Sequence, residues 1–505
     1  MSKNRTKILL IYPTIYKKTG LPIGVASLCA VLKEAKYEVK VFDTAFYNIK
    51  KEDASVKIRS DRIMSKEINN EEIFPQNNAD VFDELKKIIQ SFRPTIIGIS
   101  VLESNYSIST KLTNFIKSKF NDIYLIAGGV FPTLSPEVII AEKSIDAICV
   151  GEGEKPLLGV CEKIDAGEKP IDVEGMWIKD GDKIIKNNPS SLHDLDLLPH
   201  PDFTEFNEWL FYKPMQGKLY KMINIETTRG CPYICTYCAA PMLRNYFDEN
   251  SSGKYYRKIN MVKVIDQIHY QIKRHNPEFI YFSSETFLSM NDKDFELFVD
   301  EYSNIKIPFW FQTRFETITE ERMKRLKEIG MYWLTIGLEH GNEEFREKIL
   351  KRKYSNKMAV DKMKILSNLN IGASINNVMG FPFETRELIF DTINLNKKMW
   401  KINNKIEHNI FLLAPFQGSE LYNFCIINNL LDNGHITDTT DLADETVLNF
   451  PQSFKSELKG LIKTFNLYVK LPEKYYPDIR IAERNDSEGA QMFKKMKDLV
   501  HDCIY

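Results

Sequence analysis

The sequence predicts an α/β protein with two consecutive α/β domains and a smaller, mostly helical C-terminal extension. Three observations support this fold class. Short β-branched runs alternate with segments of helical period up to about residue 422. A chain of 505 residues is too long for one ordinary hydrophobic core. A polar, proline-containing stretch at 171–215 interrupts the alternation, and it therefore separates the two domains.

Composition argues against several classes of protein. Hydrophobic residues make up 43% and charged residues 27% of the chain, which is ordinary for a globular protein, and the formal net charge is −1. We therefore expect no nucleic-acid partner. No apolar run approaches the roughly 20 residues of a membrane span, and residues 1–20 resemble a strand rather than a signal peptide. We expect a cytoplasmic protein with reduced cysteines, in which a tight cysteine cluster binds metal.

Residues 1–170 are expected to form a Rossmann-like (flavodoxin-like), doubly wound domain, with ligands bound outside the carboxyl ends of its parallel strands. Residues 46–82 are polar and are expected to be an insertion after the second strand. A nucleotide of the NAD type needs G-x-G-x-x-G after the first strand, where this chain has YPTIYKKTGLPIG, so we do not expect NAD. The predicted strands are 7–13, 37–44, 95–101, 122–129 and 146–153.

Short motifs follow the carboxyl ends of these strands. Ser100-Val101-Leu102 follows the third, Gly128-Gly129 ends the fourth, and Gly151-Glu152-Gly153 ends the fifth. Glycine at such positions lets a large flat ligand lie close to the backbone. In this order the motifs resemble those of cobalamin-binding domains of the methionine synthase type, which carry D-x-H-x-x-G, S-x-L and G-G. The resemblance implies that cobalamin contacts Ser100, Leu102, Gly128, Gly129, Gly151 and Gly153.

The first of these motifs departs from the family pattern. Asp43 is followed by Thr44 and Ala45, so alanine takes the place of the histidine that ligates cobalt from below. Alanine has no donor atom, and axial ligation is one of the main controls that a protein has over a macrocyclic metal. The resemblance therefore implies cobalamin without a lower histidine from this motif, as in cobalamin domains fused to radical S-adenosylmethionine (SAM) enzymes.

Residues 171–215 are predicted to be a linker, with a small hairpin around Asp180-Gly181 and an irregular crossing after it. His193 and His200 within it are expected to be solvated or capping residues.

The segment RGCPYICTYCAAP holds Cys231, Cys235 and Cys238. A structural zinc site is closed and four-coordinate, and a fully ligated iron–sulfur cluster prefers four cysteines. The sequence nearby offers no second pair of ligands. Three thiolates on a 4Fe–4S cluster leave one iron open, as a catalytic cluster requires. We therefore predict that these three cysteines are both the metal ligands and the catalytic residues.

The spacing C-x3-C-x2-C, with Tyr237 between the last two cysteines, resembles the signature of radical SAM enzymes. The run 222–230 then corresponds to the first strand of that family's partial (β/α)6 barrel, which we place at 216–422. The resemblance implies that the open iron chelates the amino and carboxylate groups of SAM. An electron from the cluster then cleaves SAM to a 5′-deoxyadenosyl radical, which abstracts hydrogen from unactivated carbon.

Further barrel strands are predicted, and such barrels carry their sites at the carboxyl ends of the strands. By resemblance, Glu285 takes the place of the glutamate in G-G-E that binds the SAM amino group, although Ser283 and Ser284 replace both glycines. Glu339, within I-G-x-E, is expected at the SAM ribose. The strands are 278–287, 307–315, 333–341, 372–385 and 408–422. Other residues expected at SAM are Tyr237, Gln312, Arg314, Gly380, Phe381 and Pro382.

Two remaining segments carry no predicted chemistry. The basic run 348–357 is predicted to be a solvated helix end. Residues 423–505 have helical period and are expected to pack against the barrel mouth. Cys425 and Cys503 are expected to be ordinary small apolar residues.

Together the resemblances cover essentially the whole chain and imply a class B radical SAM methyltransferase. In that family one SAM methylates reduced cobalt, and a second yields the radical that prepares a substrate carbon for the methyl group. The implied cofactors are a 4Fe–4S cluster, SAM and cobalamin. The implied partners are an external one-electron reductant, such as flavodoxin or ferredoxin, and a small-molecule, lipid or peptide substrate.

Three other functions remain to be weighed. Cobalamin could assist a radical cyclisation, rearrangement or oxidation of a metabolite without methylation. A corrinoid carrier or sensor would need only the first domain, and the intact cysteine trio argues against it. Methylthiotransfer would need a second cluster, but Cys29, Cys149 and Cys161 fall on a helix, a strand and a later helix.

Overall fold

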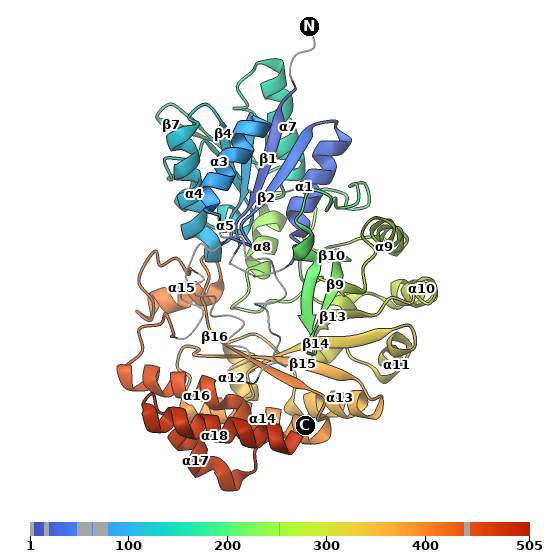
Figure 1. Cartoon of the computed structure of the whole chain (residues 1–505), viewed down its shortest axis with the longest axis vertical. Helices are drawn as coiled ribbons and strands as arrows, with labels where there is room; N and C mark the ends of the chain where they lie inside the picture. Colours follow the sequence, from blue (N-terminus) through green and yellow to red (C-terminus); the bar gives the residue numbers. More distant parts are fainter. Residues whose placement is uncertain are drawn as a thin grey trace.

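The computed structural model describes residues 5–14, 20–47, 63, 79–251, 253–438 and 445–504, with side chains up to residue 500. Most of the insertion predicted at 46–82 and the side chain of Cys503 lie outside this part of the chain. Figure 1 shows two α/β units stacked along the long axis, with the red C-terminal helices at the far end. Within the described residues, no helix combines the length and the apolar character needed to cross a bilayer.

The first unit is a seven-stranded sheet in the order β2-β1-β3-β4-β5-β6-β7. Its first five strands are parallel, and apolar side chains fill both faces because helices cover both sides. The doubly wound fold is thereby confirmed. The predicted hairpin at Asp180-Gly181 forms and extends this sheet as β6 and β7. The strands are β1 (Lys7–Tyr12), β2 (Glu38–Asp43), β3 (Ile96–Ser100), β4 (Tyr124–Gly128), β5 (Ala147–Cys149), β6 (Met176–Asp180) and β7 (Lys183–Lys186).

Helices cover the two faces of this sheet in two groups. One face packs against α1 (Ile23–Glu34) and α7 (Glu154–Ala166). The other packs against α3 (Val81–Phe92), α4 (Tyr106–Lys119) and the short helices α5 (Val130–Leu134) and α6 (Pro136–Ile140). This arrangement leaves the carboxyl edge of the sheet to loops, which is where ligands bind in such folds.

The second unit is a sheet in the order β16-β15-β14-β13-β12-β9-β8, in which all the strands except β8 run parallel. The two ends of this sheet do not pair with each other, so the described strands form an open half-barrel, as the (β/α)6 prediction expected. The strands are β8 (Tyr212–Met215), β9 (Lys218–Ile225), β12 (Phe279–Phe282), β13 (Phe309–Thr313), β14 (Met331–Glu339), β15 (Gly372–Met379) and β16 (Glu407–Leu412).

Alternation along these strands sends one set of side chains outward and the other inward. The outward set is apolar, for example Ile223, Phe282 and Leu334, and it packs under the helices. The helices are α9 (Met261–His275), α10 (Asp292–Tyr302), α11 (Glu320–Glu328), α12 (Glu343–Lys348), α13 (Asn356–Asn368) and α14 (Arg386–Ile402). The inward set is largely polar, and it includes the residues discussed below.

The C-terminal helices cover the outside of the half-barrel. α16 (Gln452–Lys470) packs against α14 and β16, and α17 (Tyr476–Ala482) and α18 (Ser487–Ile504) pack on it. The C-terminal region also reaches the barrel mouth, where Leu431 and Leu448 pack with Phe381 and where Leu458 of α16 approaches Gly380. The prediction that this region packs against the mouth therefore holds for the described residues that precede α16 and for the beginning of that helix.

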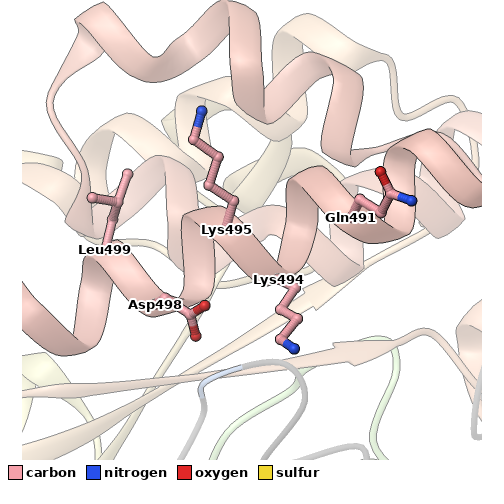
Figure 2. Close-up of a pocket in the computed structure, with 5 residues that line it drawn as sticks. All are labelled: Gln491, Lys494, Lys495, Asp498 and Leu499. Atoms are coloured by element: carbon pink, nitrogen blue, oxygen red, sulfur yellow. The ribbon is translucent and has the colours of Figure 1, made fainter.

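A shallow hollow on α18 is lined by side chains of that one helix. Figure 2 shows Gln491, Lys494, Lys495, Asp498 and Leu499 pointing in different directions. They do not converge on a common point, so we assign no site to this hollow.

Two sets of hydrogen bonds hold the carboxyl edges of the two sheets against each other. Asn224 at the end of β9 donates through Nδ2 to the carbonyl of Leu21, which follows β1, at 2.9 Å. Glu103, which follows β3, accepts the backbone N–H groups of Gln417 and Thr437 at 2.7 Å each. The edge predicted to bind cobalamin and the edge predicted to bind SAM therefore face each other.

Candidate functional site

The three cysteines lie in the loop between β10 (Thr228–Arg229) and α8 (Ala240–Asn250), at the carboxyl edge of the half-barrel. Cys235 is buried, whereas Cys231 and Cys238 are partly exposed. Burial raises the pKa of Cys231 and raises that of Cys238 to about 12. Charge on Cys235 adds to both shifts, which places the three sulfur atoms close together.

The donors around these thiols fit an iron–sulfur cluster. The backbone N–H of Ala240 lies 3.4 Å from Cys238 Sγ, and Nη1 of Arg314 lies 3.4 Å from Cys235 Sγ. Hydrogen bonds to sulfur and nearby positive charge stabilise the thiolate ligands of such clusters and tune their potential. The other cysteines with described side chains lie in regular elements elsewhere, at Cys29 in α1, Cys149 in β5, Cys161 in α7 and Cys425 in α15 (Glu420–Ile427). A cluster with three protein thiolates and one open iron fits this loop.

Ser284 ties the cysteine loop to β12. Its buried hydroxyl accepts the backbone N–H groups of Thr227 and Thr228 at 2.8 and 3.3 Å, and it bonds to Thr227 Oγ1 at 2.7 Å. The backbone N–H of Ser283 donates to the carbonyl of Ile225 at 2.9 Å. The two serines that replace the family's glycines therefore brace the strand that leads into the cysteines.

Glu285 follows these serines and has no hydrogen-bond partner among the described side chains. Its side chain contacts solvent, but the surrounding barrel excludes much of the bulk water, and this desolvation raises the pKa of the carboxyl. Its charge raises the pKa of Cys231 and Cys238, so the carboxylate lies near the thiols. A free carboxylate in this place suits a cationic group such as an amine.

Glu339, at the end of β14, is held by a buried arginine. Nη1 of Arg352 lies 3.2 Å from Glu339 Oε1 and 2.9 Å from the hydroxyl oxygen of Tyr237, and Nη2 donates to the carbonyl of Gly337 at 2.7 Å. A Cβ at position 337 would overlap the Glu339 carboxylate, so glycine there makes room for it. Burial raises the pKa of Glu339, and Arg352 opposes that shift.

The basic run 348–357 therefore needs a correction. Its lysines are exposed as predicted, but Arg352 is only 5% exposed and points into the site. The prediction of a solvated helix end is wrong for this residue, because an ion pair with Glu339 compensates for the burial of its charge.

The turn 380–382 after β15 is closed by Glu384. Oε2 of that carboxylate accepts the backbone N–H groups of Gly380 and Phe381 at 2.5 and 3.1 Å. Nε2 of His340 lies 3.2 Å from the other carboxylate oxygen, and Nδ1 of His340 accepts the backbone N–H of residue 342. The imidazole proton therefore belongs on Nε2, and His340 links the end of β14 to the turn.

Gln312 in β13 and Arg314 directly after that strand reach different neighbours. The guanidinium of Arg314 lies 3.7 Å from the ring centroid of Tyr233, in the cysteine segment, and pairs with Glu316 at 2.6 Å. Gln312 lies one layer deeper and donates to the hydroxyl of Tyr281. The structure brings Arg314 to the thiols, whereas a contact between Gln312 and SAM stays a prediction.

The carboxyl edge of the first sheet has features that suit a large flat ligand. Gly129 has a φ of +114°, and a Cβ there would lie 2.8 Å from the carbonyl oxygen of Val101. Leu102 and Val130 leave 39% and 38% of their surface exposed beside this backbone. Exposed apolar side chains next to backbone that lacks Cβ atoms fit a macrocycle such as a corrin.

A lower histidine is absent from this domain altogether. Ala45 is fully buried in the structure, and the first 192 residues of the sequence contain no histidine. The departure noted at Ala45 is therefore not compensated by an imidazole from elsewhere in the first unit.

Protein side chains fill the space beside two further predicted glycines. A Cβ at Gly151, where φ is +116°, would lie 3.0 Å from the ring of Phe247, and one at Gly153 would lie 3.3 Å from Leu28. These glycines serve close packing, and a direct contact with cobalamin stays a prediction for both. Phe247 belongs to α8, so the helix after the third cysteine packs against the first domain.

A buried group of charges also joins the first domain to the cysteine loop. Arg229, two residues before Cys231, lies 3.0 Å from a carboxylate oxygen of Glu152 and 3.0 Å from one of Glu154. Arg257 of β11 (Arg257–Lys258) pairs with the same Glu152. His193 is buried 3.8 Å from Glu154, so the expectation of a solvated residue was wrong. With arginines among the carboxylates, we interpret this group as an ion-pair network rather than a metal site.

Sequence reasoning missed several of these residues. Glu152 lies between Gly151 and Gly153, and Arg229 lies two residues before Cys231, so opposite charges at two motifs were an available signal. Arg352 gave no such signal in the sequence, because it lies in a lysine-rich run after β14. Glu384 follows the turn 380–382 by two residues, so an acid close to a glycine-containing turn was the available signal.

Two family models match the chain. The B12 binding domain matches residues 15–160, and the Radical SAM superfamily matches residues 225–395. The matches fall on the two sheets described above and together span more than half of the chain. The chain belongs to the radical SAM proteins that carry a B12-binding domain. It is a radical SAM enzyme, and its cofactors are a 4Fe–4S cluster, SAM and cobalamin.

Similar proteins include enzymes of more than one kind. An uncharacterized methyltransferase of Pyrococcus horikoshii is 25% identical over 443 residues, which is 84% of each chain. The cytidylyl-2-hydroxyethylphosphonate methyltransferase of Streptomyces wedmorensis is 20% identical over 84% of this chain and 83% of its own. The anaerobic magnesium-protoporphyrin IX monomethyl ester cyclase of Rubrivivax gelatinosus is 24% identical over 67% and 60%.

Solved structures share the fold at low sequence identity. The cobalamin-dependent radical SAM enzyme OxsB aligns with a TM-score of 0.65 at 15% identity, over 98% of this chain and 71% of that one. The radical SAM methyltransferase TsrM from Kitasatospora setae aligns with a TM-score of 0.60 at 15% identity, over 83% and 75%. The arrangement of both domains is therefore that of cobalamin-dependent radical SAM enzymes.

Proposed function

We propose that this enzyme transfers a methyl group, carried by its cobalamin, from SAM to an unactivated carbon of a small molecule, lipid or peptide. The observation that carries the proposal is the apposition of the two carboxyl edges through Glu103–Gln417 and Arg229–Glu152. A methyl carrier and a radical generator that act on one carbon must share a face, because transfer depends on proximity and orientation. The similarity to relatives that are named methyltransferases also supports the proposal of methyl transfer.

The chain's own residues bind and orient SAM in this proposal. Glu285, which has no described partner, takes the amino group, and Glu339, held by Arg352, accepts the ribose hydroxyls. The turn 380–382, fixed by Glu384, offers its backbone to the adenine. The bound cluster and SAM supply the hydrogen-abstracting radical, and cobalamin supplies the methyl group.

The first edge orients cobalamin through backbone and apolar contacts. Gly129 brings the ligand close to the strand ends, and Leu102 and Val130 cover apolar surface of the ring. Without a histidine in the first domain, no imidazole from that domain donates to cobalt, which alters the reactivity of the metal. An external one-electron donor of the flavodoxin or ferredoxin type reduces the cluster.

A radical reaction without methylation is the second candidate. The similarity to a cyclase over 67% of this chain is the observation that favours it. In that case the same SAM-binding residues act, and cobalamin assists electron flow rather than carrying a methyl group.

The products of labelled SAM separate the two candidates. We would load the enzyme anaerobically with iron, sulfide and hydroxocobalamin, add a strong reductant and methyl-deuterated SAM, and quantify the products by mass spectrometry. Methyl transfer predicts S-adenosylhomocysteine together with 5′-deoxyadenosine. Deoxyadenosine without S-adenosylhomocysteine contradicts it and supports the second candidate. Alanine at Cys231, Cys235 and Cys238 together is the control, and it should abolish deoxyadenosine.

A further inference from the structure

The inward face of the half-barrel is built in three layers along the strands. The layer at the carboxyl edge carries the proposed SAM residues. The layer at the opposite end is apolar and closes the bottom with Met222, Phe279 and Trp333. Between them lies a polar middle layer that the SAM contacts do not use, formed by Lys213, Asn224, Tyr281, Trp310 and Gln312.

Lys213 is the charged member of this middle layer. It projects from β8, and its ammonium donates to Asn224 Oδ1 at 3.1 Å and lies 4.6 Å from the ring centroid of Tyr281. Trp310 stacks on the same tyrosine at 4.0 Å between ring centroids. Among the described residues no carboxylate pairs with Lys213, whereas Lys221 on the adjacent strand pairs with Glu208 at 3.0 Å.

The middle layer also holds a hydrogen-bond donor without a described partner. Trp310 Nε1 is buried, and the described residues offer it no acceptor. Trp310 stacks on one face of the Tyr281 ring and the Lys213 ammonium lies over the other face, so the ring separates these two donors. Among the described residues, Glu285 is the carboxylate whose charge acts on Tyr281, and it does not pair with Lys213. Lys213 is partly buried, and desolvating a charge without a counter-charge is costly, so a bound anion would stabilise it.

The position of the layer fits a substrate anchor. It lies directly beneath the edge that holds Glu285 and Arg314 on neighbouring strands. Its Asn224 also donates to Leu21, and Lys213 lies beside Gly20, so the loop after β1 of the cobalamin domain meets it. A molecule held here would reach toward both cofactor edges.

We infer that Lys213 and the middle layer bind an oxyanion of the substrate, a carboxylate or a phosphate-type group, and so hold the reacting carbon beneath the two cofactors. The inference rests on the proposed function in that it takes the half-barrel to hold the substrate. Lys213 supplies both the charge and the N–H groups that bind the oxyanion, and Asn224 orients its ammonium. Desolvation supports this by lowering the pKa of Lys213 to about 8, a value that a bound anion would raise again.

Carbamoylation by cyanate tests this directly in the cofactor-loaded enzyme. Cyanate modifies neutral amines, so a lysine with a low pKa reacts on the order of tenfold or more faster than an ordinary one. Site-resolved mass spectrometry would compare Lys213 with Lys221 in chloride, acetate and inorganic phosphate at equal ionic strength. We expect faster labelling of Lys213 in chloride. At an anion concentration of twice the dissociation constant, protection should be about threefold.

The outcomes are decisive in both directions. Protection by acetate identifies a carboxylate site, and protection by phosphate identifies a phosphate-type site. Labelling of Lys213 no faster than Lys221, or equal labelling in all three salts, overturns the inference.

A variant separates binding from a structural role. In Lys213→Met, a side chain of similar volume replaces the unpaired charge, so the thermal midpoint should equal or exceed that of the unmodified enzyme. A midpoint several degrees lower would show that Lys213 serves the fold, and it would overturn the inference. Neither measurement depends on methyl transfer, so the inference and the proposed function can fail separately.

Discussion

The guanidinium of Arg352 lies 3.2 Å from the carboxylate of Glu339, and both side chains are almost completely buried at the mouth of the half-barrel. The same guanidinium contacts the hydroxyl of Tyr237, which lies between two of the cysteines. One arginine therefore positions both the residue proposed at the SAM ribose and the segment that holds the cluster.

Replacement of Arg352 should weaken SAM binding and the fold together. Arg352→Met leaves Glu339 buried without a counter-charge, which costs about 3–5 kcal/mol of the free energy of unfolding. SAM affinity should fall about tenfold or more, equivalent to about 1.4 kcal/mol. Calorimetric titration and chemical denaturation measure both. Lys351→Met is the matched control, because Lys351 is exposed and its ion-pair partner in the described part of the chain is the exposed Glu420. Equal effects of the two variants would contradict the assignment.

Gly337 should tolerate no side chain. A Cβ at this position overlaps the Glu339 carboxylate and approaches Arg352 Nη1 at 3.2 Å, so Gly337→Ala displaces the pair. We expect a loss of SAM affinity of about tenfold (about 1.4 kcal/mol). Gly167→Ala is the control for backbone effects, because Gly167 has a positive φ but open space around it. Undiminished SAM binding by Gly337→Ala would show that Glu339 does not contact the ribose.

The hydrogen bonds of Ser284 should contribute more to the free energy of unfolding than that of the Ser283 hydroxyl. Ser284→Ala leaves the N–H groups of Thr227 and Thr228 without an acceptor, at a cost of about 1–3 kcal/mol. Ser283→Ala removes only a 3.4 Å bond to the carbonyl of Ile225 and should change stability little. Denaturation curves and the iron content after reconstitution test this difference. If both variants lose the same stability, the brace does not exist.

The free energy of unfolding should decrease as pH rises, because Glu103 titrates in the folded protein. Burial raises the pKa of this carboxyl from 4.5 to about 7 in the folded protein. Between these values the folded state binds more protons than the unfolded state, so the free energy of unfolding falls as pH rises from 4.5 to about 7. Glu103→Gln should flatten that slope, whereas Glu137→Gln, at an exposed surface position, should not. An unchanged slope in Glu103→Gln would remove this group from the pH dependence.

Arg229 should hold the two domains and the cysteine loop together. Arg229→Met leaves Glu152 and Glu154 with less counter-charge in a buried place, at a cost of about 3–5 kcal/mol. Arg229→Lys should recover part of that loss. Arg484→Met, which breaks an exposed pair with Asp486, should change stability by less than about 0.5 kcal/mol. The free energy of unfolding from denaturant titration is the measurement, and a wild-type value for Arg229→Met would contradict the role.

The domain order and the cysteine site were predictable because they depend on local pattern. The alternation of strands and helices and the spacing of Cys231, Cys235 and Cys238 are visible along the chain. The structure also shows that the backbone N–H of Gln417 bonds to Glu103, a contact that a proline at this position could not make.

The contacts that could not be predicted join residues far apart in the sequence. The sequence predicts that Arg352 belongs to a solvated basic run, and only the fold shows that it contacts Glu339. The sequence predicts that Gly151 lets a ligand approach the backbone, but the ring of Phe247 lies beside it. In both cases a charge or a glycine has the same local signature whether its partner is solvent, a ligand or another part of the chain.

Mössbauer spectroscopy tests the central claim most directly, namely that three cysteines hold a 4Fe–4S cluster whose open iron binds SAM. The enzyme would be reconstituted anaerobically with iron-57 and measured with and without SAM. The account predicts one such cluster per chain, with SAM changing the signal of one iron in four. A cluster with no SAM-sensitive iron, or a full cluster in the variant with alanine at Cys231, Cys235 and Cys238, would contradict it.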